Sequence, residues 1–132
     1  MISNGGTGLR FEYRRVYASS DGESHFATVT VEMISGVYVP GIPLVDSTRP
    51  QAVTALTLSH IPAGYDSDWH HAPRRQFVLV LSGTLQVTVS DGQVQGFGPG
   101  SLFFVEDTTG KGHMSRAVGT NDVVWAAVAA AG

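Results

Sequence analysis

Apolar and polar residues alternate along much of this chain, in short runs that glycine and proline separate. Alternation with a period of two is typical of β-strands, and no stretch carries a convincing helical period. The runs that we interpret as strands are residues 25–33, 53–61, 76–81, 84–89, 93–97, 102–105 and 122–129. With the strands that the N-terminal residues can add, about nine short strands predict an all-β sandwich or barrel.

Two segments fall outside this pattern. Residues 1–20 are polar and glycine-rich, and we expect them to form an N-terminal arm that is open to fraying, before a single domain over residues 21–132. Residues 36–50, GVYVPGIPLVDSTRP, contain three prolines. Because proline cannot donate to a strand ladder, this segment is expected to be a long ordered loop or an edge segment.

The alternation also assigns side chains to faces. In residues 53–61, Leu56, Leu58 and His60 share one face. We expect that face to be the interior, which brings His60 close to the mouth of the barrel. In residues 76–81 both faces are apolar except at Gln76, which predicts a central strand covered on both sides. A buried Gln76 needs a hydrogen-bond partner or a ligand.

Composition narrows the classes of function. The 132-residue chain suits one domain, and the absence of cysteine excludes disulfides, thiolate metal sites and cysteine nucleophiles. A net charge of −3 with eight scattered basic residues argues against nucleic acid as a partner. No apolar run approaches the roughly 18 residues of a membrane span, so we expect a soluble, cytoplasmic protein without a membrane partner.

Two stretches carry the candidate chemistry. In GYDSDWHHAPRRQFVLVLSG, Gly64 is followed by five residues and His70, then by Gln76 and, after six more residues, by a glycine. In GPGSLFFVEDTTGKGH, a Pro-Gly turn is followed by His113. The two stretches resemble the two sequence motifs of the cupins, and the chain is similar to small bacterial single-domain cupins. The resemblance implies a double-stranded β-helix, or jelly-roll barrel, of two antiparallel sheets.

The departures from the cupin motifs bear on metal binding. Ala72 stands at the second histidine position and Gln76 at the glutamate position, so the usual site of three histidines and one glutamate is reduced to His70, Gln76 and His113. Glutamine lacks the charge that offsets a divalent cation. We expect either a weakly held divalent metal (Zn, Ni, Fe or Mn) or no cofactor. The candidates for an additional ligand are His60, His71, Glu106 and Asp107.

Two classes of function remain open. One is an enzyme of the isomerase, cyclase or lyase type, in which His70 and His113 are the catalytic residues that move a proton in the barrel. The other is a module that binds or senses a small ligand without changing it. A metal-dependent dioxygenase is a third interpretation, which the lost ligand positions disfavour. The residues expected to bind the ligand are His60, Tyr65, Trp69 and Gln76.

The expected partners are a small molecule and a second copy of the chain. Hydrophobic residues make up 42% of the sequence, and the N-terminal arm and residues 36–50 offer apolar surface for a partner to cover. Sandwiches of this kind often leave a sheet face or edge open. We therefore expect a homodimer.

Overall fold

The computed structural model describes residues 1–5 and 8–132. The elements of this part are β1 (Ile2–Gly5), β2 (Gly8–Ala18), β3 (Ser24–Glu32), β4 (Ile34–Gly36), β5 (Val45–Ser47), β6 (Val53–Ile61), β7 (Gln76–Ser82), β8 (Leu85–Val89), β9 (Val94–Phe97), β10 (Leu102–Val105), β11 (His113–Ala117) and β12 (Val123–Ala130). None of these elements is a helix, so none of the described residues belongs to a helix that could cross a membrane.

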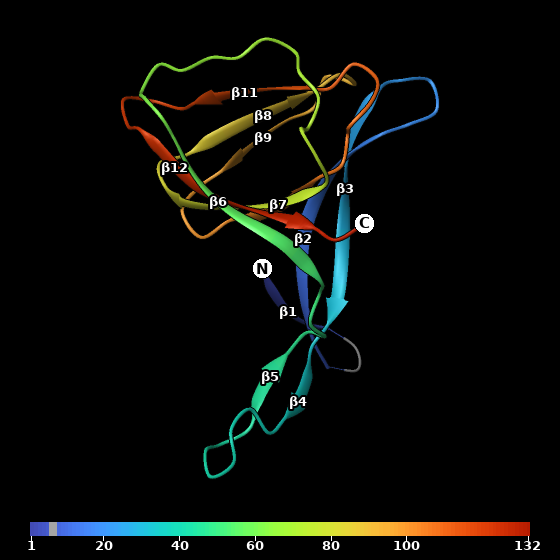
Figure 1. Ribbon diagram of the computed structural model, residues 1–132, viewed down its shortest axis with the longest axis vertical. Helices are drawn as coiled ribbons and strands as arrows, with labels where there is room; N and C mark the ends of the chain where they lie inside the picture. Colours follow the sequence, from blue (N-terminus) through green and yellow to red (C-terminus); the bar gives the residue numbers. More distant parts are fainter. Residues whose placement is uncertain (6–7) are drawn as a thin grey trace.

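The strands form a barrel from two sheets (Figure 1). The large sheet has the order β1-β2-β10-β7-β12-β6, with β3 beside β2, and the small sheet has the order β11-β8-β9. All pairs in these sheets are antiparallel except β2 with β10. The predicted all-β jelly-roll barrel is confirmed.

The hydrophobic core lies between the two sheets. Val16, Val80 and Val123 of the large sheet and Val87 and Val89 of the small sheet are almost completely buried. Alternate residues of each strand point into this core, because successive side chains lie on opposite faces. The ring of Phe103 in the large sheet stacks on Phe97 in the small sheet, with 4.1 Å between the ring centroids. The core therefore joins the two sheets and fixes the spacing of the barrel walls.

The N-terminal segment belongs to the barrel. β2 pairs with β3 on one side and with β10 on the other, and Val16 is fully buried. The barrel therefore begins before residue 21, where the sequence predicted the domain to start. β11 is a second difference: residues 113–117 were not expected to be a strand, yet they pair with β8 along their whole length.

The proline-rich segment is a projecting hairpin rather than a loop along the barrel. β4 pairs with β5, and the two short strands extend away from the barrel with residues 37–44 at the tip (Figure 1). Pro40 and Pro43 lie at the tip, where they limit the length of the paired part because proline cannot donate to the ladder.

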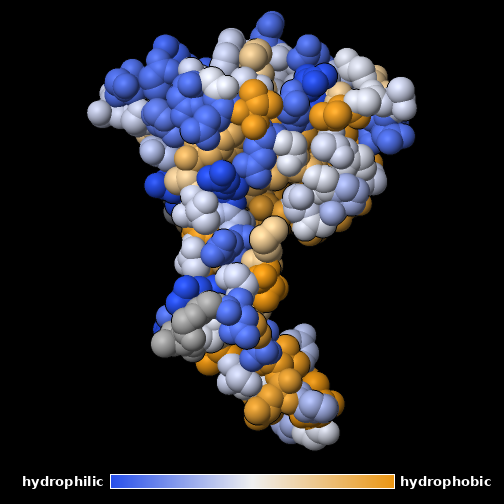
Figure 2. All heavy atoms as spheres, turned by 180° about the vertical axis from the view of Figure 1, so that it is seen from behind, coloured by the Kyte–Doolittle hydropathy of each residue, from blue (hydrophilic) through white to orange (hydrophobic). Residues whose placement is uncertain are grey.

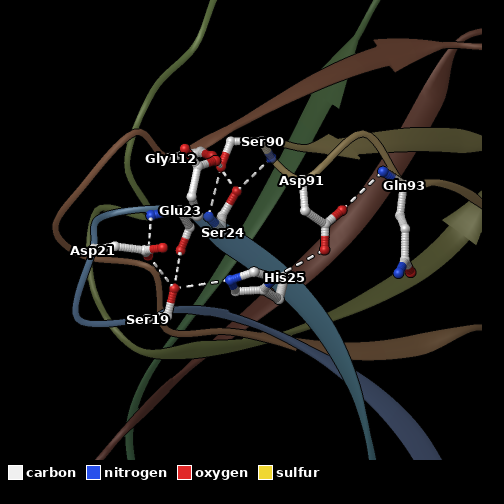
Figure 3. Close-up of polar contacts among 9 residues, drawn as sticks. All are labelled: Ser19, Asp21, Glu23, Ser24, His25, Ser90, Asp91, Gln93 and Gly112. Carbon is white, nitrogen blue, oxygen red and sulfur yellow. Dashed lines mark hydrogen bonds and ion pairs between the residues drawn. The ribbon is translucent and has the colours of Figure 1, made fainter.

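A polar network outside the barrel joins the β2–β3 turn to the loops before β9 and β11 (Figure 3). Ser24 is fully buried, and its hydroxyl donates to the carbonyl of Gly112 at 2.7 Å and accepts from the backbone N–H of Ser90 at 2.7 Å. Glu23 accepts from the Ser90 hydroxyl at 2.6 Å and forms an ion pair with Lys111. The network holds the backbone immediately before His113.

His25 belongs to the same polar network and has a structural role there. Its ring nitrogens lie 2.8 Å from the hydroxyl of Ser19 and 2.9 Å from the carboxylate of Asp91 (Figure 3). These contacts tie the start of β3 to the turn after β8.

Candidate functional site

One cavity of about 420 Å³ lies inside the barrel and contains most of the sequence-predicted residues. Its walls come from β6, β7, β10 and β12 of the large sheet and from β8 and β11 of the small sheet, and its mouth is lined by Tyr65, His70, His71, Pro73 and Arg74. The polar residues on the walls and mouth include Ser59, Tyr65, His70, Arg74, Gln76 and His113. A concave site with an apolar wall and a few converging polar groups is typical of small-molecule binding.

His113 lies deepest among the cavity histidines. It is the first residue of β11, and only 6% of its surface is exposed. Its Nδ1 lies 2.6 Å from Oδ2 of Asp107, a residue that is completely buried. An ionised carboxylate can only accept, so Nδ1 of His113 carries the proton and donates it. In the tautomer that carries its only proton on Nδ1, Nε2 is unprotonated and is the nitrogen that can accept a proton or bind a ligand.

His70 lies beside His113. Their backbones exchange two hydrogen bonds of 2.9 Å, and their ring centroids are 4.6 Å apart. Nδ1 of His70 donates to the carbonyl oxygen of Asp68 at 2.9 Å, and the side chain is exposed at the cavity mouth. Both rings are therefore held through Nδ1, which leaves Nε2 of each ring for a ligand, a metal or a proton.

Gly112 makes this approach of the two backbones feasible. A Cβ atom at Gly112 would lie 2.2 Å from the carbonyl oxygen of His70, and the residue has a φ of +76°. Only glycine combines this conformation with this contact at low cost. The conformation of the loop before His113 therefore depends on Gly112, although Gly112 has no side chain that could contact a ligand.

Gln76 begins β7 and points into the cavity. Its side chain is buried, and its Oε1 has no hydrogen-bond partner among the described residues. A buried amide oxygen without a partner costs free energy unless a bound molecule or ion supplies one. The same holds for Oδ1 of Asp107, which is also buried and unpartnered within the described part of the chain.

Arg74 gives the cavity mouth a positive charge. Arg74 and His71 line it, whereas no aspartate or glutamate is among the lining residues. Nε2 of His71 contacts the carbonyl of Gly110, which ties the residue to the loop before β11. Arg75 is directed elsewhere: it pairs with Glu106 at 4.0 Å and lies over the ring of Phe104. Arg74 makes no ion pair with the described residues.

The expectation that His60 faces the interior is wrong. Thr57, Ser59 and Ile61 line the cavity, so Leu56, Leu58 and His60 face outward. His60 is exposed, and its Nε2 lies 2.8 Å from Oδ2 of Asp122. The face was misassigned because apolar residues were taken as interior, whereas on β6 the cavity side is the more polar side.

Of the two aromatic residues predicted to contact the ligand, Tyr65 and Trp69, only Tyr65 lines the cavity. The role of Tyr65 in binding a ligand stays a prediction. Trp69 is 47% exposed and is not among the residues that line the cavity. His71, a candidate for an additional metal ligand, also lines the mouth, because residues 69–75 do not form a regular strand in which consecutive side chains take opposite faces.

The sequence pattern did not identify the partner of His113. Glu106 and Asp107 were equal candidates for an additional role, and only the structure separates them. Glu106 turns to Arg15 at 3.4 Å and to Arg75 at the sheet surface, whereas Asp107 is buried behind His113. The spacing of six residues across an irregular loop has no periodicity from which this contact could be predicted.

The donors available to a metal ion are few. The described residues contain no group of three or more histidine, cysteine, aspartate or glutamate side chains that could hold a metal ion. His70, His113 and Gln76 remain as two imidazole nitrogens and one amide oxygen, all neutral. The unpartnered Oε1 of Gln76 fits a ligand role. Such a set suits a divalent transition metal in ligand type but not in charge, so it fits weak binding only.

Solved structures with a similar arrangement of strands are distant in sequence. A cupin-2 domain protein from Shewanella frigidimarina is 19% identical, with a TM-score of 0.45 over 63% of this chain and 81% of that one. The cupin domain of Schizosaccharomyces pombe Cnp3 is 14% identical, with a TM-score of 0.49 over 91% and 88% of the two chains. A predicted oxalate decarboxylase from Thermotoga maritima is 14% identical, with a TM-score of 0.46 over 76% and 94%.

No curated protein matches the sequence. The family model of the cupin domain matches residues 57–129, a stretch that contains both motifs and every strand from β7 to β11. Since this match covers more than half of the chain, the protein belongs to the cupin domain family.

Proposed function

We propose that the barrel binds a small molecule that carries a carboxylate and moves a proton to or from it, as an isomerase, cyclase or lyase does. The observation that carries this proposal is the buried contact of 2.6 Å between Nδ1 of His113 and Asp107, at a histidine that lines the cavity. A general base needs an unprotonated nitrogen within reach of its substrate and a partner that orients the ring.

In the proposed reaction His113 takes a proton from the substrate through Nε2. The ring then carries a positive charge, which the carboxylate of Asp107 offsets by Coulomb attraction in a water-poor surrounding. His70 lies close to His113, at 4.6 Å between ring centroids, and is exposed at the cavity mouth. Its free Nε2 would first take up a proton from solvent and then deliver that proton to a neighbouring substrate atom, and His113 would release the proton it has taken to solvent to complete the cycle. Gln76 would donate its amide N–H groups to a substrate oxygen or accept from a hydroxyl through Oε1.

The charge at the mouth supports an anionic substrate. Arg74 offers a planar set of N–H donors that match a carboxylate, and the other titratable residues on the cavity lining are Tyr65 and three histidines, with no carboxylate among them. A cation on a cavity lining that contains no aspartate or glutamate attracts anions into the cavity.

A divalent metal is a secondary part of the proposal. His70, Gln76 and His113 would hold it, and it would polarise an oxygen of the substrate when bound. Because the three donors are neutral, we propose weak and partial occupancy.

We also propose that two copies of the chain associate. The described residues expose sixteen large hydrophobic side chains, and a surface so rich in apolar groups is typical of an interface.

Native mass spectrometry of the purified protein, followed by a thermal-shift screen of small mono- and dicarboxylates, tests the substrate class. We expect carboxylates to raise the unfolding temperature of the wild type and of Arg49→Gln, which removes an exposed arginine on the β5–β6 connection. The shift should be lost in Arg74→Gln. Equal shifts in both variants would contradict an anion site at Arg74.

Time courses by NMR in D₂O then separate enzyme from binding module. Solvent deuterium should enter a bound carboxylate, and the exchange should fall by about 100-fold or more in His113→Ala. A ligand that binds but never exchanges or changes would support a binding module.

A further inference from the structure

The β4–β5 hairpin is an apolar arm without a partner in its own chain. Among the described strands, β4 and β5 make extensive contacts only with each other. At the tip, Val37, Tyr38, Val39, Ile42 and Leu44 are each 47–71% exposed. We call residues 34–47 the apolar arm, and Figure 2 shows hydrophobic residues gathered at this projecting end of the molecule.

An arm of this kind needs cover to be stable. An isolated two-stranded hairpin is marginally stable in water, and a contiguous exposed apolar patch marks an interaction site. The arm also gives the chain excess surface. The accessible surface is 7737 Å² for a mass of 14.0 kDa. A compact monomer of that mass exposes about 6,700 Å², roughly 1,000 Å² less. One partner of a standard stable interface buries about 800 Å².

A second uncovered apolar surface lies on the barrel. Leu56 and Leu58 of β6 point outward and are 66% and 67% exposed. They face the same side as Ala126 and Val128 of β12, their direct partners across the ladder, and as Phe77 and Leu79 of β7. We call these six residues the outer face. A sheet face in water is ordinarily polar, whereas all six residues here are apolar. Ala126 is buried within its own chain and Phe77, Leu79 and Val128 are partly buried, but Leu56 and Leu58 stay strongly exposed, which indicates that a partner covers them.

The two surfaces match in chemistry. The apolar arm carries one charged residue, Asp46, and the outer face carries none. Neither surface offers a charged group that would select a polar or nucleic-acid partner. The arm extends away from the barrel, so one chain cannot cover its own outer face with it (Figure 1). A second copy supplies both missing surfaces at once, because a two-fold axis repeats each contact.

We propose that two copies exchange their arms, so that the apolar arm of each copy packs on the outer face of the other. This inference rests on the proposed homodimer and specifies its contact. The exchange covers both apolar surfaces of both chains. The exchange leaves the cavity open, because no residue of the apolar arm or of the outer face lines it. The residues of β6, β7 and β12 that do line the cavity point to the opposite side of the sheet.

Sedimentation velocity over a range of protein concentrations tests the exchange. The wild type should sediment at twice the 14.0 kDa chain mass. Val39→Glu in the arm and Leu58→Glu on the outer face should each raise the dimer dissociation constant by about 100-fold or more, because each places a charge in an apolar contact. Val94→Glu is the matched control: Val94 is 53% exposed on β9, outside both surfaces, and this variant should stay dimeric.

The outcomes separate the homodimer from its contact. A wild type that is monomeric at every concentration overturns both. A dimer that persists in Val39→Glu and in Leu58→Glu overturns the arm exchange and leaves the homodimer standing. Circular dichroism of each variant must keep the β spectrum of the wild type.

Cross-linking gives a test that tolerates an unstable variant. The chain has no cysteine, so the two introduced by Val39→Cys and Leu58→Cys are its only thiols. A short bismaleimide should join two chains in this double variant. It should join far fewer in Val94→Cys with Leu58→Cys. Equal yields in the two double variants would overturn the exchange.

Discussion

His70 and His113 lie 43 positions apart in the chain, yet each donates its backbone N–H to the carbonyl of the other at 2.9 Å. This bridge brings the two cupin motifs together, with ring centroids 4.6 Å apart at the cavity. The proposed chemistry depends on that spacing, because the positions of both rings follow from the backbone rather than from flexible side chains.

The close approach at Gly112 predicts a large effect of a single methyl group. Gly112→Ala should lower the free energy of unfolding by about 3 kcal/mol or more, since it combines an unfavourable φ with a backbone contact of 2.2 Å. Gly119→Ala is the control, because Gly119 has a φ of +72° with no atom within 4 Å of its Cβ position. It should cost about 1 kcal/mol. Urea unfolding measures both, and similar losses would refute the contact.

The ion pair on the polar network predicts a dependence of stability on pH. Hydrogen bonds from Lys111 and then from Ser90 hold the pKa of Glu23 below its ordinary 4.5. The unfolded chain therefore takes up a proton at a higher pH than the folded chain. The stability from this carboxylate is complete above pH 4.5 and is lost as the pH falls through the lower pKa of the folded state.

Glu23→Gln removes this contribution. At pH 6 the variant should unfold at a lower temperature than the wild type, because it lacks the ion pair. Between pH 6 and about pH 3 its unfolding temperature should fall less than that of the wild type. Glu32→Gln, at an exposed carboxylate on β3, should follow the wild-type profile. If Glu23→Gln and the wild type have parallel profiles, Glu23 does not contribute to acid sensitivity.

Because His70, Gln76 and His113 are neutral donors, we predict that a negative charge introduced at position 76 strengthens metal binding. Gln76→Glu should raise the affinity for Ni²⁺ or Zn²⁺ by about tenfold or more, because a carboxylate offsets part of the cation's charge. Without metal the same variant should unfold at a lower temperature than the wild type, since it buries a carboxylate. Titration calorimetry and thermal unfolding measure the two effects. Gln93→Glu, on an exposed turn, should change neither.

The barrel could be predicted from the sequence because its strands are short, alternating and separated by glycine or proline. Residues 53–61 and 102–105 were predicted at the bounds that the structure shows. The face of β6 could not be predicted, because Leu56 and Leu58 lie outside and Ser59 lines the cavity. Period two says which residues share a face but not which face is inside.

The site was predictable only in part. The motif spacing located His70, Gln76 and His113, and all three line the cavity. Their catalytic and metal-binding roles stay predictions. Asp107 and Arg74 could not be assigned from spacing, because both lie in irregular segments whose contacts depend on the folded backbone.

The protonation of the His113 ring tests the central proposal most directly. Long-range ¹H–¹⁵N NMR of the imidazole nitrogens at about pH 8 reports which nitrogen of a neutral ring carries the proton. We predict Nδ1–H and a free Nε2 in the wild type, because Nδ1 lies 2.6 Å from the Asp107 carboxylate. In Asp107→Asn the proton should move to Nε2. A wild-type ring protonated at Nε2 would contradict the proposed role of His113 as the base.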